Sequence, residues 1–110
     1  MEVNWKTKES MQLVEALLSL KNPEESRLFL RDLMTKGEIE EFARRLEAAR
    51  LLSKDTQYSA IIEKTGLSST TVARISKWLK GSLGGYKLVL NRMHHTNSHT
   101  QTRKGLSLHT

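Results

Sequence analysis

The fold is decided by residues 58–79, which read YSAIIEKTGLSSTTVARISKWL and predict two short helices joined by a tight turn. Ile61 and Ile62 supply an inner face for the first helix, and Gly66 follows as a turn residue that tolerates positive φ. In the second helix, apolar residues recur at i, i+3 and i+7 on one side: Val72, Ile75 and Leu79. The pattern indicates a helix-turn-helix.

The opposite side of the second predicted helix carries hydroxyl and basic groups and no carboxylate. Thr70, Arg74 and Lys77 recur at i, i+4 and i+7, and Thr71 lies beside them. A helix face that is merely solvated usually mixes charges of both signs. An ordinary helical hairpin with solvated charges is the alternative interpretation, since short motifs give false positives. The absence of acid nevertheless favours a surface that binds an anion.

Charge is divided unequally along the chain. Residues 1–63 hold ten Lys or Arg and twelve Asp or Glu, a net charge of −2, whereas residues 64–110 hold eight Lys or Arg and no acid, a net charge of +8. Neutralisation of phosphates with release of counterions supplies most non-specific DNA affinity. An anionic membrane is the other candidate, but no broad apolar face lies opposite the basic residues. We therefore expect double-stranded DNA as the partner and no membrane.

The chain before this motif predicts three helices and no strand. Residues 7–20 repeat apolar side chains at helical spacing. Asn22-Pro23 starts a second helix, because Asn is a good cap and Pro fits the first helical position. Thr35 and Glu38 form a capping-box pattern for a third helix over residues 36–53.

The chain after the motif contains a glycine-rich turn, one short helix and a polar tail. Residues 80–86 hold three of the six glycines and predict the end of the second motif helix. A last helix follows over roughly residues 86–93, and residues 94–110 are polar and without periodicity, which predicts a disordered tail. We expect one all-α DNA-binding domain over residues 1–93, with its helix-turn-helix at residues 58–79.

Length and composition exclude several other classes. A chain of 110 residues has room for a modest core, and small helical units often complete their core by dimerising. The absence of cysteine excludes a disulfide framework and a thiolate metal site. We recognise neither a signal peptide nor an apolar run of transmembrane length, and we expect a cytoplasmic, nucleoid-associated protein.

An enzyme is not expected, because the histidines lie where no fixed geometry is predicted. All four occur in the predicted tail: His94, His95, His99 and His109. Catalysis needs groups held in fixed mutual positions. Weak binding of a transition metal by the first three is the alternative, and we predict neither a catalytic residue nor a metal site.

Three segments are the most distinctive: Leu33-Met34-Thr35 through Arg45-Leu46, Thr70-Thr71-Val72-Ala73-Arg74, and Gly84-Gly85-Tyr86. Residues from about 28 to 79, with the helix order around them, resemble the Trp repressor superfamily, and the segment that ends in Gly84-Gly85-Tyr86 most resembles its YerC/YecD-type branch. The resemblance covers roughly residues 10–92. It implies an all-helical, intertwined homodimer in which each chain presents one helix-turn-helix to the major groove.

The resemblance also bears on whether the protein binds a small-molecule corepressor. The best-known family member binds L-tryptophan, and three residues here match positions whose counterparts contact that ligand: Thr35, Arg45 and Arg74. Two arginines can hold a carboxylate and stack on an indole. The match fails at Ile75 and Trp78, where the tryptophan-binding member has small residues. The alternatives are an i, i+4 ion pair of Arg45 with Glu41, a phosphate contact for Arg74, and a place for Trp78 in the core or the dimer seam. We expect no cofactor, with an amino-acid corepressor as the less favoured alternative.

The DNA contacts are expected from the second motif helix and from the start of the first. Ser69, Thr70 and Thr71 would lie near base edges, and Arg74 could contact guanine or a phosphate. The set is completed by Ser68, which like Ser69 is a suitable N-cap for the helix, and by four residues placed to meet phosphates: Tyr58, Ser59, Lys77 and Lys80. The sequence thus predicts a sequence-specific, repressor-like transcriptional regulator that acts as a homodimer. A non-regulatory nucleic-acid-associated module or a protein-binding adaptor is the alternative.

Overall fold

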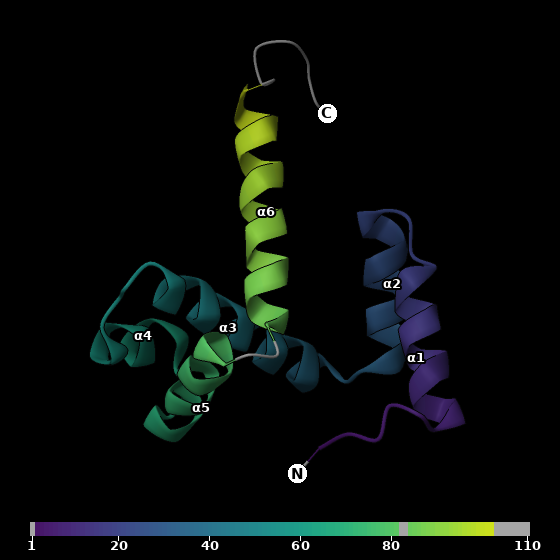
Figure 1. The fold of residues 1–110 in the computed structure, drawn as a ribbon, viewed down its shortest axis with the longest axis horizontal. Coiled ribbons are helices and arrows are strands. Elements are labelled where there is room, and N and C mark those ends of the chain that lie inside the picture. Colours follow the sequence, from purple (N-terminus) through teal and green to yellow (C-terminus); the bar gives the residue numbers. More distant parts are fainter. Residues whose placement is uncertain (1, 82–83, 103–110) are drawn as a thin grey trace. The chain divides into compact units, whose positions relative to one another are not determined.

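The computed structural model describes residues 2–81 and 84–102, with side chains described as far as His94. Within these ranges the chain forms six helices and no strand (Figure 1), which confirms the predicted all-α class. The helices are α1 (Lys8–Leu18), α2 (Pro23–Leu33), α3 (Lys36–Ser53), α4 (Tyr58–Thr65), α5 (Ser69–Lys80) and α6 (Gly85–Thr102). The chain divides into two compact units, one up to Ile39 and one from Glu40 onward.

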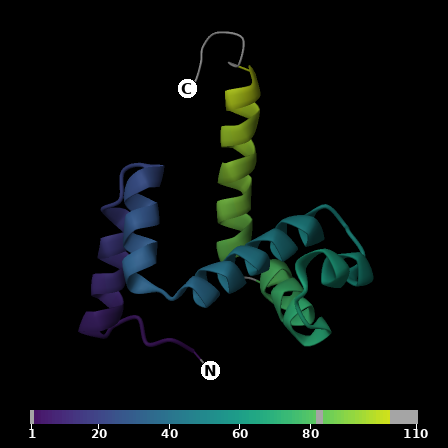
Figure 2. The same cartoon turned by 180° about the vertical axis from the view of Figure 1, so that it is seen from behind.

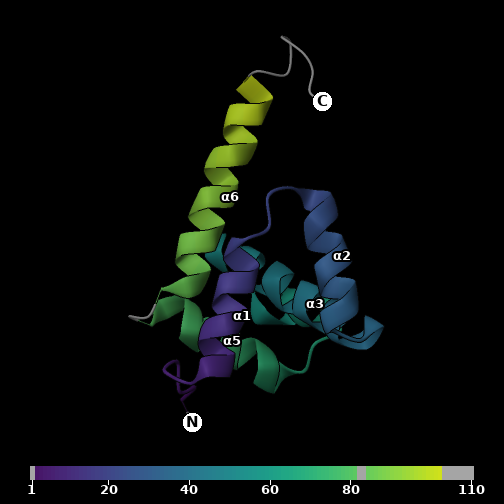
Figure 3. The ribbon, with the colours of Figure 1, turned by 90° about the vertical axis from the view of Figure 1, so that its right-hand side faces the viewer.

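The N-terminal unit contains α1 and α2, which run in opposite directions (Figure 3). Both helices begin at side-chain caps. The Ser10 N–H donates to the Thr7 hydroxyl at 3.0 Å, and the Glu25 N–H donates to the Asn22 side-chain oxygen at 2.9 Å. The Asn22 cap and the position of Pro23 at the start of α2 confirm the prediction. Neither helix buries a single residue, so their apolar stripes stay uncovered within this unit.

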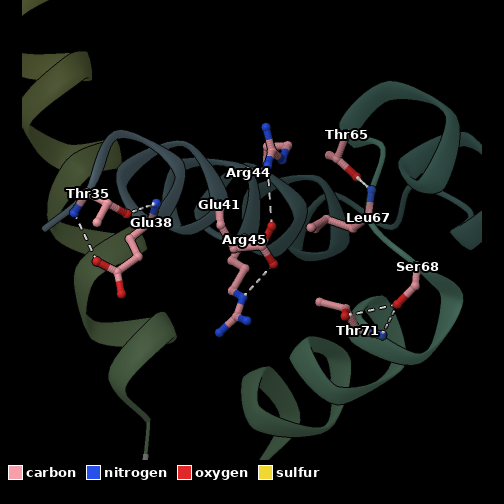
Figure 4. Close-up of polar contacts among 9 residues, drawn as sticks. All are labelled: Thr35, Glu38, Glu41, Arg44, Arg45, Thr65, Leu67, Ser68 and Thr71. Atoms are coloured by element: carbon pink, nitrogen blue, oxygen red, sulfur yellow. Dashed lines mark hydrogen bonds and ion pairs between the residues drawn. The ribbon is translucent and has the colours of Figure 1, made fainter.

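The start of α3 is fixed by the predicted capping box. The Glu38 N–H donates to the Thr35 hydroxyl at 3.1 Å, and the Thr35 N–H donates to the Glu38 carboxylate at 2.9 Å (Figure 4). Two backbone donors that a helix start leaves unsatisfied are thereby bonded.

The core of the C-terminal unit lies where α3, α4 and α5 meet (Figure 2). Its buried apolar members are Ala48, Ala49, Leu51, Ile61, Leu67, Val72 and Ile75. Ile61 and Val72 have no exposed surface, and the alanines let α3 approach its neighbours closely. Tyr86 and Leu90 of α6 pack against this cluster from outside.

The predicted end of α6 was wrong. The helix continues to Thr102 instead of ending near Met93, so residues 94–102 of the predicted tail are helical. No Gly or Pro occurs between Tyr86 and Thr102, and extending an existing helix costs far less than starting one. Residues 103–110 of that tail lie outside the described residues. None of the helices in the described ranges is long and apolar enough to cross a bilayer.

Candidate nucleic-acid interface

The turn between α4 and α5 is a three-residue connection whose geometry requires glycine. Gly66 has φ of 75°, in the left-handed region, and its N–H donates to the Ile62 carbonyl at 2.9 Å. The buried Thr65 hydroxyl donates to the Ile61 carbonyl at 2.7 Å and accepts from the Leu67 N–H at 3.2 Å (Figure 4). These bonds fix the path of the chain into α5. The sequence reasoning missed Thr65, because a threonine before a glycine carries no distinctive signal.

Ser68, and not Ser69, is the N-cap of α5. The Thr71 N–H donates to the Ser68 hydroxyl at 3.1 Å, and that hydroxyl donates to the Thr71 hydroxyl at 3.0 Å (Figure 4). The Ser68 hydroxyl is therefore occupied within the chain, while the Thr71 hydroxyl keeps its own proton for another acceptor. Ser69 and Thr70 are exposed in the first turn of the helix.

The buried and exposed sides of α5 are the ones that the residue spacing predicts. Val72, Ile75 and Leu79 are buried, together with Ser76. The exposed side holds Ser69, Thr70, Ala73, Arg74, Lys77, Trp78 and Lys80. Within the part of the chain that the structure describes, Arg74 and Lys77 make no hydrogen bond or ion pair. The basic groups of this face are thus free to bind an external anion.

The start of α4 presents a second set of groups that favour binding of a phosphate. Tyr58 and Ser59 are exposed in its first turn. Gln57 precedes the helix, and its side chain forms no capping hydrogen bond. The first backbone N–H groups of α4 therefore lack a side-chain acceptor, and together with the helix dipole they favour a phosphate at this position.

Arg45 and Arg74 line one small pocket in the C-terminal unit. Its volume is about 150 Å³, and its other lining residues are Thr71, Ile75, Trp78 and Tyr86. Arg45 donates from Nε to the Glu41 carboxylate at 3.2 Å, as the i, i+4 spacing predicts, and its guanidinium carbon lies 5.4 Å from the centre of the Phe42 ring. Thr35, the third residue matched to the corepressor contacts, belongs to the N-terminal unit and caps α3.

Trp78 does not lie in the core of its own chain. Its residue surface is 49% exposed, although one part of the side chain lines the pocket beside Arg74. A place in the core, one of the two positions predicted for it, is therefore wrong. The residue lies one helical turn after Arg74, on the border between the buried and the exposed sides of α5.

A larger cavity of about 470 Å³ lies between the end of α3 and the first half of α6. Four basic side chains are among its lining residues: Arg50, Lys54, Lys87 and His94. Arg50 donates two hydrogen bonds to Glu47, at 2.9 and 2.7 Å, which lowers the pKa of that carboxyl group. The sequence reasoning missed this grouping, because it joins residues that are more than thirty positions apart.

Among the side chains that the structure describes, no three His, Cys, Asp or Glu residues come together as a metal site. His95, His99 and His109, which belong to the predicted tail, have no described side chains.

Comparisons of the sequence and of the structure with known proteins indicate the same family. The family model described as Trp repressor protein matches residues 8–94. The uncharacterized protein YerC of Bacillus subtilis (strain 168) is 36% identical over 96 residues, covering 87% of this chain and 92% of its own length. A TrpR-like protein from Eubacterium eligens ATCC 27750 has a crystal structure that aligns with a TM-score of 0.77 at 37% identity, covering 82% of this chain and 93% of its own. The structure of a candidate Trp repressor from Staphylococcus aureus aligns with a TM-score of 0.75 at 30% identity, covering 81% and 89% respectively. The chain therefore belongs to the Trp repressor family.

Proposed function

We propose that this protein is a sequence-specific, repressor-like transcriptional regulator that binds double-stranded DNA as a homodimer. The observation that carries the proposal is the exposed face of α5, where Arg74 and Lys77 have no partner among the described residues and no carboxylate lies on the same face. Family membership supports the same class, because Trp-repressor-like proteins are DNA-binding regulators.

The first turn and a half of α5 would read the bases. Ser69 and Thr70 are small and exposed, so the helix backbone can come close to the base edges. Arg74 follows one turn later with a free guanidinium, whose paired donors match the acceptors of guanine in the major groove. Thr71 contributes a hydroxyl proton, since its oxygen already accepts from Ser68.

Phosphate contacts would come from the edges of the motif. Lys77 and Lys80 follow along the exposed side and the end of α5, and Tyr58 and Ser59 stand beside the uncapped N–H groups of α4. Such contacts set the position and orientation of the protein on the duplex without reading sequence. A DNA ligand of this kind would place the protein with the bacterial nucleoid in the cytoplasm.

The exposed apolar side chains of the N-terminal unit support the homodimer. In the N-terminal unit neither α1 nor α2 buries a residue, and Leu17, Leu28 and Leu33 are each about half exposed, at 47%, 47% and 51%. Helices of eleven residues are marginal in water without a packing partner. A second copy that covers these stripes would make residues 1–93 one domain, and a two-fold dimer sets its recognition helices ~34 Å apart, suited to a palindromic site.

Selection of duplexes from a random pool tests the function directly. We expect enrichment of a palindromic sequence, bound at least ~10³-fold more tightly than competitor DNA at physiological salt. Binding of every duplex with equal affinity would instead indicate a non-regulatory nucleic-acid-associated module. Absence of DNA binding altogether would favour a protein-binding adaptor, and either result would refute the regulator.

Single substitutions then separate base reading from phosphate binding. Arg74→Ala should weaken binding to the selected duplex by about 1–3 kcal/mol and relax the preference at one base position. Lys80→Ala should weaken all duplexes alike and reduce the salt slope by about one. Arg27→Ala, an exposed basic residue of α2, is the charge-matched control and should change neither quantity. Equal losses on selected and random DNA for Arg74→Ala would remove its base-reading role.

A further inference from the structure

We infer that this protein binds its DNA site without an L-tryptophan corepressor, because its own Ile75, Trp78 and Tyr86 side chains close the space where the family's ligand would bind. The inference rests on the proposed DNA-binding function, and it concerns the regulation of the same helix. It starts from the pocket in which Arg45 and Arg74 meet.

The recess between these residues is smaller than the amino acid, so the six side chains cannot enclose it. A volume of about 150 Å³ remains between Arg45, Arg74 and the four other lining residues. An apolar cavity of that volume accommodates a molecule the size of benzene. An indole ring is already larger than benzene, and L-tryptophan adds a carboxylate, an ammonium group and two further carbons.

Arg45 is also already occupied. Its Nε donates to the Glu41 carboxylate at 3.2 Å, and its guanidinium lies over the Phe42 ring. A ligand carboxylate brought to the same guanidinium would stand close to the Glu41 carboxylate, and two like charges at such a distance repel. Arg45 therefore already pairs with an internal anion, and this pair opposes the binding of an external anion at the same side chain. Of the two arginines in this pocket, Arg74 is the one that has no ion-pair partner among the described residues.

The orientation of α5 does not depend on a bound molecule either. On one side α5 packs against α4, and Val72 of α5 belongs to the same core cluster as Ile61 of α4. On another side it packs against α6, whose Tyr86 both contacts the core and lines the pocket. A ligand changes a conformational equilibrium only through a difference in its affinity for the two states. A helix that its own chain holds on both sides needs no such ligand to present Arg74.

Two measurements with L-tryptophan test the inference. In the first, calorimetry and thermal unfolding of the protein alone at millimolar L-tryptophan should give no saturable heat and no rise in Tm. In the second, the dialysed protein should bind its selected duplex with the same Kd, within about twofold, with or without the amino acid. A corepressor would tighten that binding by about 5- to 150-fold. Saturable heat, a rise in Tm or a tightening of this size would overturn the inference.

The first measurement needs no DNA, so its result stands even if no duplex is selected and the proposed function fails. The part played by Trp78 is tested with a Trp78→Ala variant, and Trp5→Ala, another exposed tryptophan, is the matched control. Removing the Trp78 ring enlarges the pocket, so indole should raise the Tm of Trp78→Ala but not that of the wild type or of Trp5→Ala. If indole changes the Tm of Trp78→Ala and of the wild type equally, or changes neither, then Trp78 does not close the pocket.

Discussion

Replacement of Gly66 by alanine tests the turn that sets α5 in place. The residue has φ of 75°, and a Cβ atom built on it would meet no atom within 4 Å. Steric contact with the rest of the protein therefore contributes nothing, and the whole effect comes from the backbone. Left-handed backbone costs an L-residue about 1–2 kcal/mol. Gly66→Ala should lower the free energy of unfolding by that amount, a substantial part of the roughly 5–15 kcal/mol that stabilises a typical domain.

Gly37 supplies the control for the same change. It also has open space around a built Cβ, but it lies in the first turn of the right-handed helix α3. Alanine there loses less conformational entropy on folding than glycine does, so Gly37→Ala should raise the free energy of unfolding by up to about 1 kcal/mol. Gly66→Asn should fall between wild type and Gly66→Ala, because asparagine tolerates the left-handed region better.

Urea unfolding followed by circular dichroism measures all three variants. The protein concentration must be held constant, since the stability of the proposed dimer would depend on it. With an m value of about 1–3 kcal/mol/M, the midpoint for Gly66→Ala should fall by roughly 0.3–2 M. A midpoint equal to that of the wild type would refute the conformational reasoning. So would an equal loss in Gly37→Ala, because a Cβ atom has open space at both sites and only Gly66 of the two has a positive φ.

Two further predictions concern the start of α5 and the acidic pH range. Ser68→Ala should cost about 1 kcal/mol in urea unfolding by removing the acceptor of the Thr71 N–H, whereas Ser69→Ala, which removes no cap, should cost much less. Hydrogen bonding from Arg50 holds the pKa of Glu47 below its ordinary 4.5, so this carboxylate stabilises the fold above that pH and loses its effect as the pH falls through the lowered value. Glu47→Gln should therefore show a smaller drop in Tm than the wild type between neutral and acidic pH, by a modest amount because the pair is exposed. An identical drop in both proteins would contradict this assignment.

The sequence predicted best those features that depend on residues within one helical turn. The Asn22 cap, the capping box of Thr35 and Glu38, and the pair of Arg45 with Glu41 each join residues three or four positions apart. At that separation the helix itself brings the groups together. For the same reason, the spacing of Val72, Ile75 and Leu79 gave the buried side of α5 correctly.

Features that depend on distant residues could not be predicted in this way. Tyr86 lines the pocket beside Arg45, forty-one positions away in the sequence, and only the packing of α6 brings them together. The cavity that Arg50 and Lys87 line has the same origin. The end of α6 failed for a different reason, because polar residues without a helix breaker carry no signal that separates a solvated helix from a coil.

The candidate interface is basic for two reasons. Its face of α5 contains basic residues, and within the described part of the chain these residues have no neighbouring carboxylate to neutralise them, unlike the arginines of α3. On α3, Arg44 and Arg45 both contact Glu41, at 3.4 and 3.2 Å, and they leave the helix on opposite sides of it (Figure 4). Exposed pairs of this kind add little stability, but they neutralise the field of each arginine at short range. On α5, Arg74 and Lys77 have no such carboxylate among the described residues. The positive field is therefore strong on the helix that also presents Ser69 and Thr70, and it would attract a phosphate backbone to the surface that we propose reads the bases.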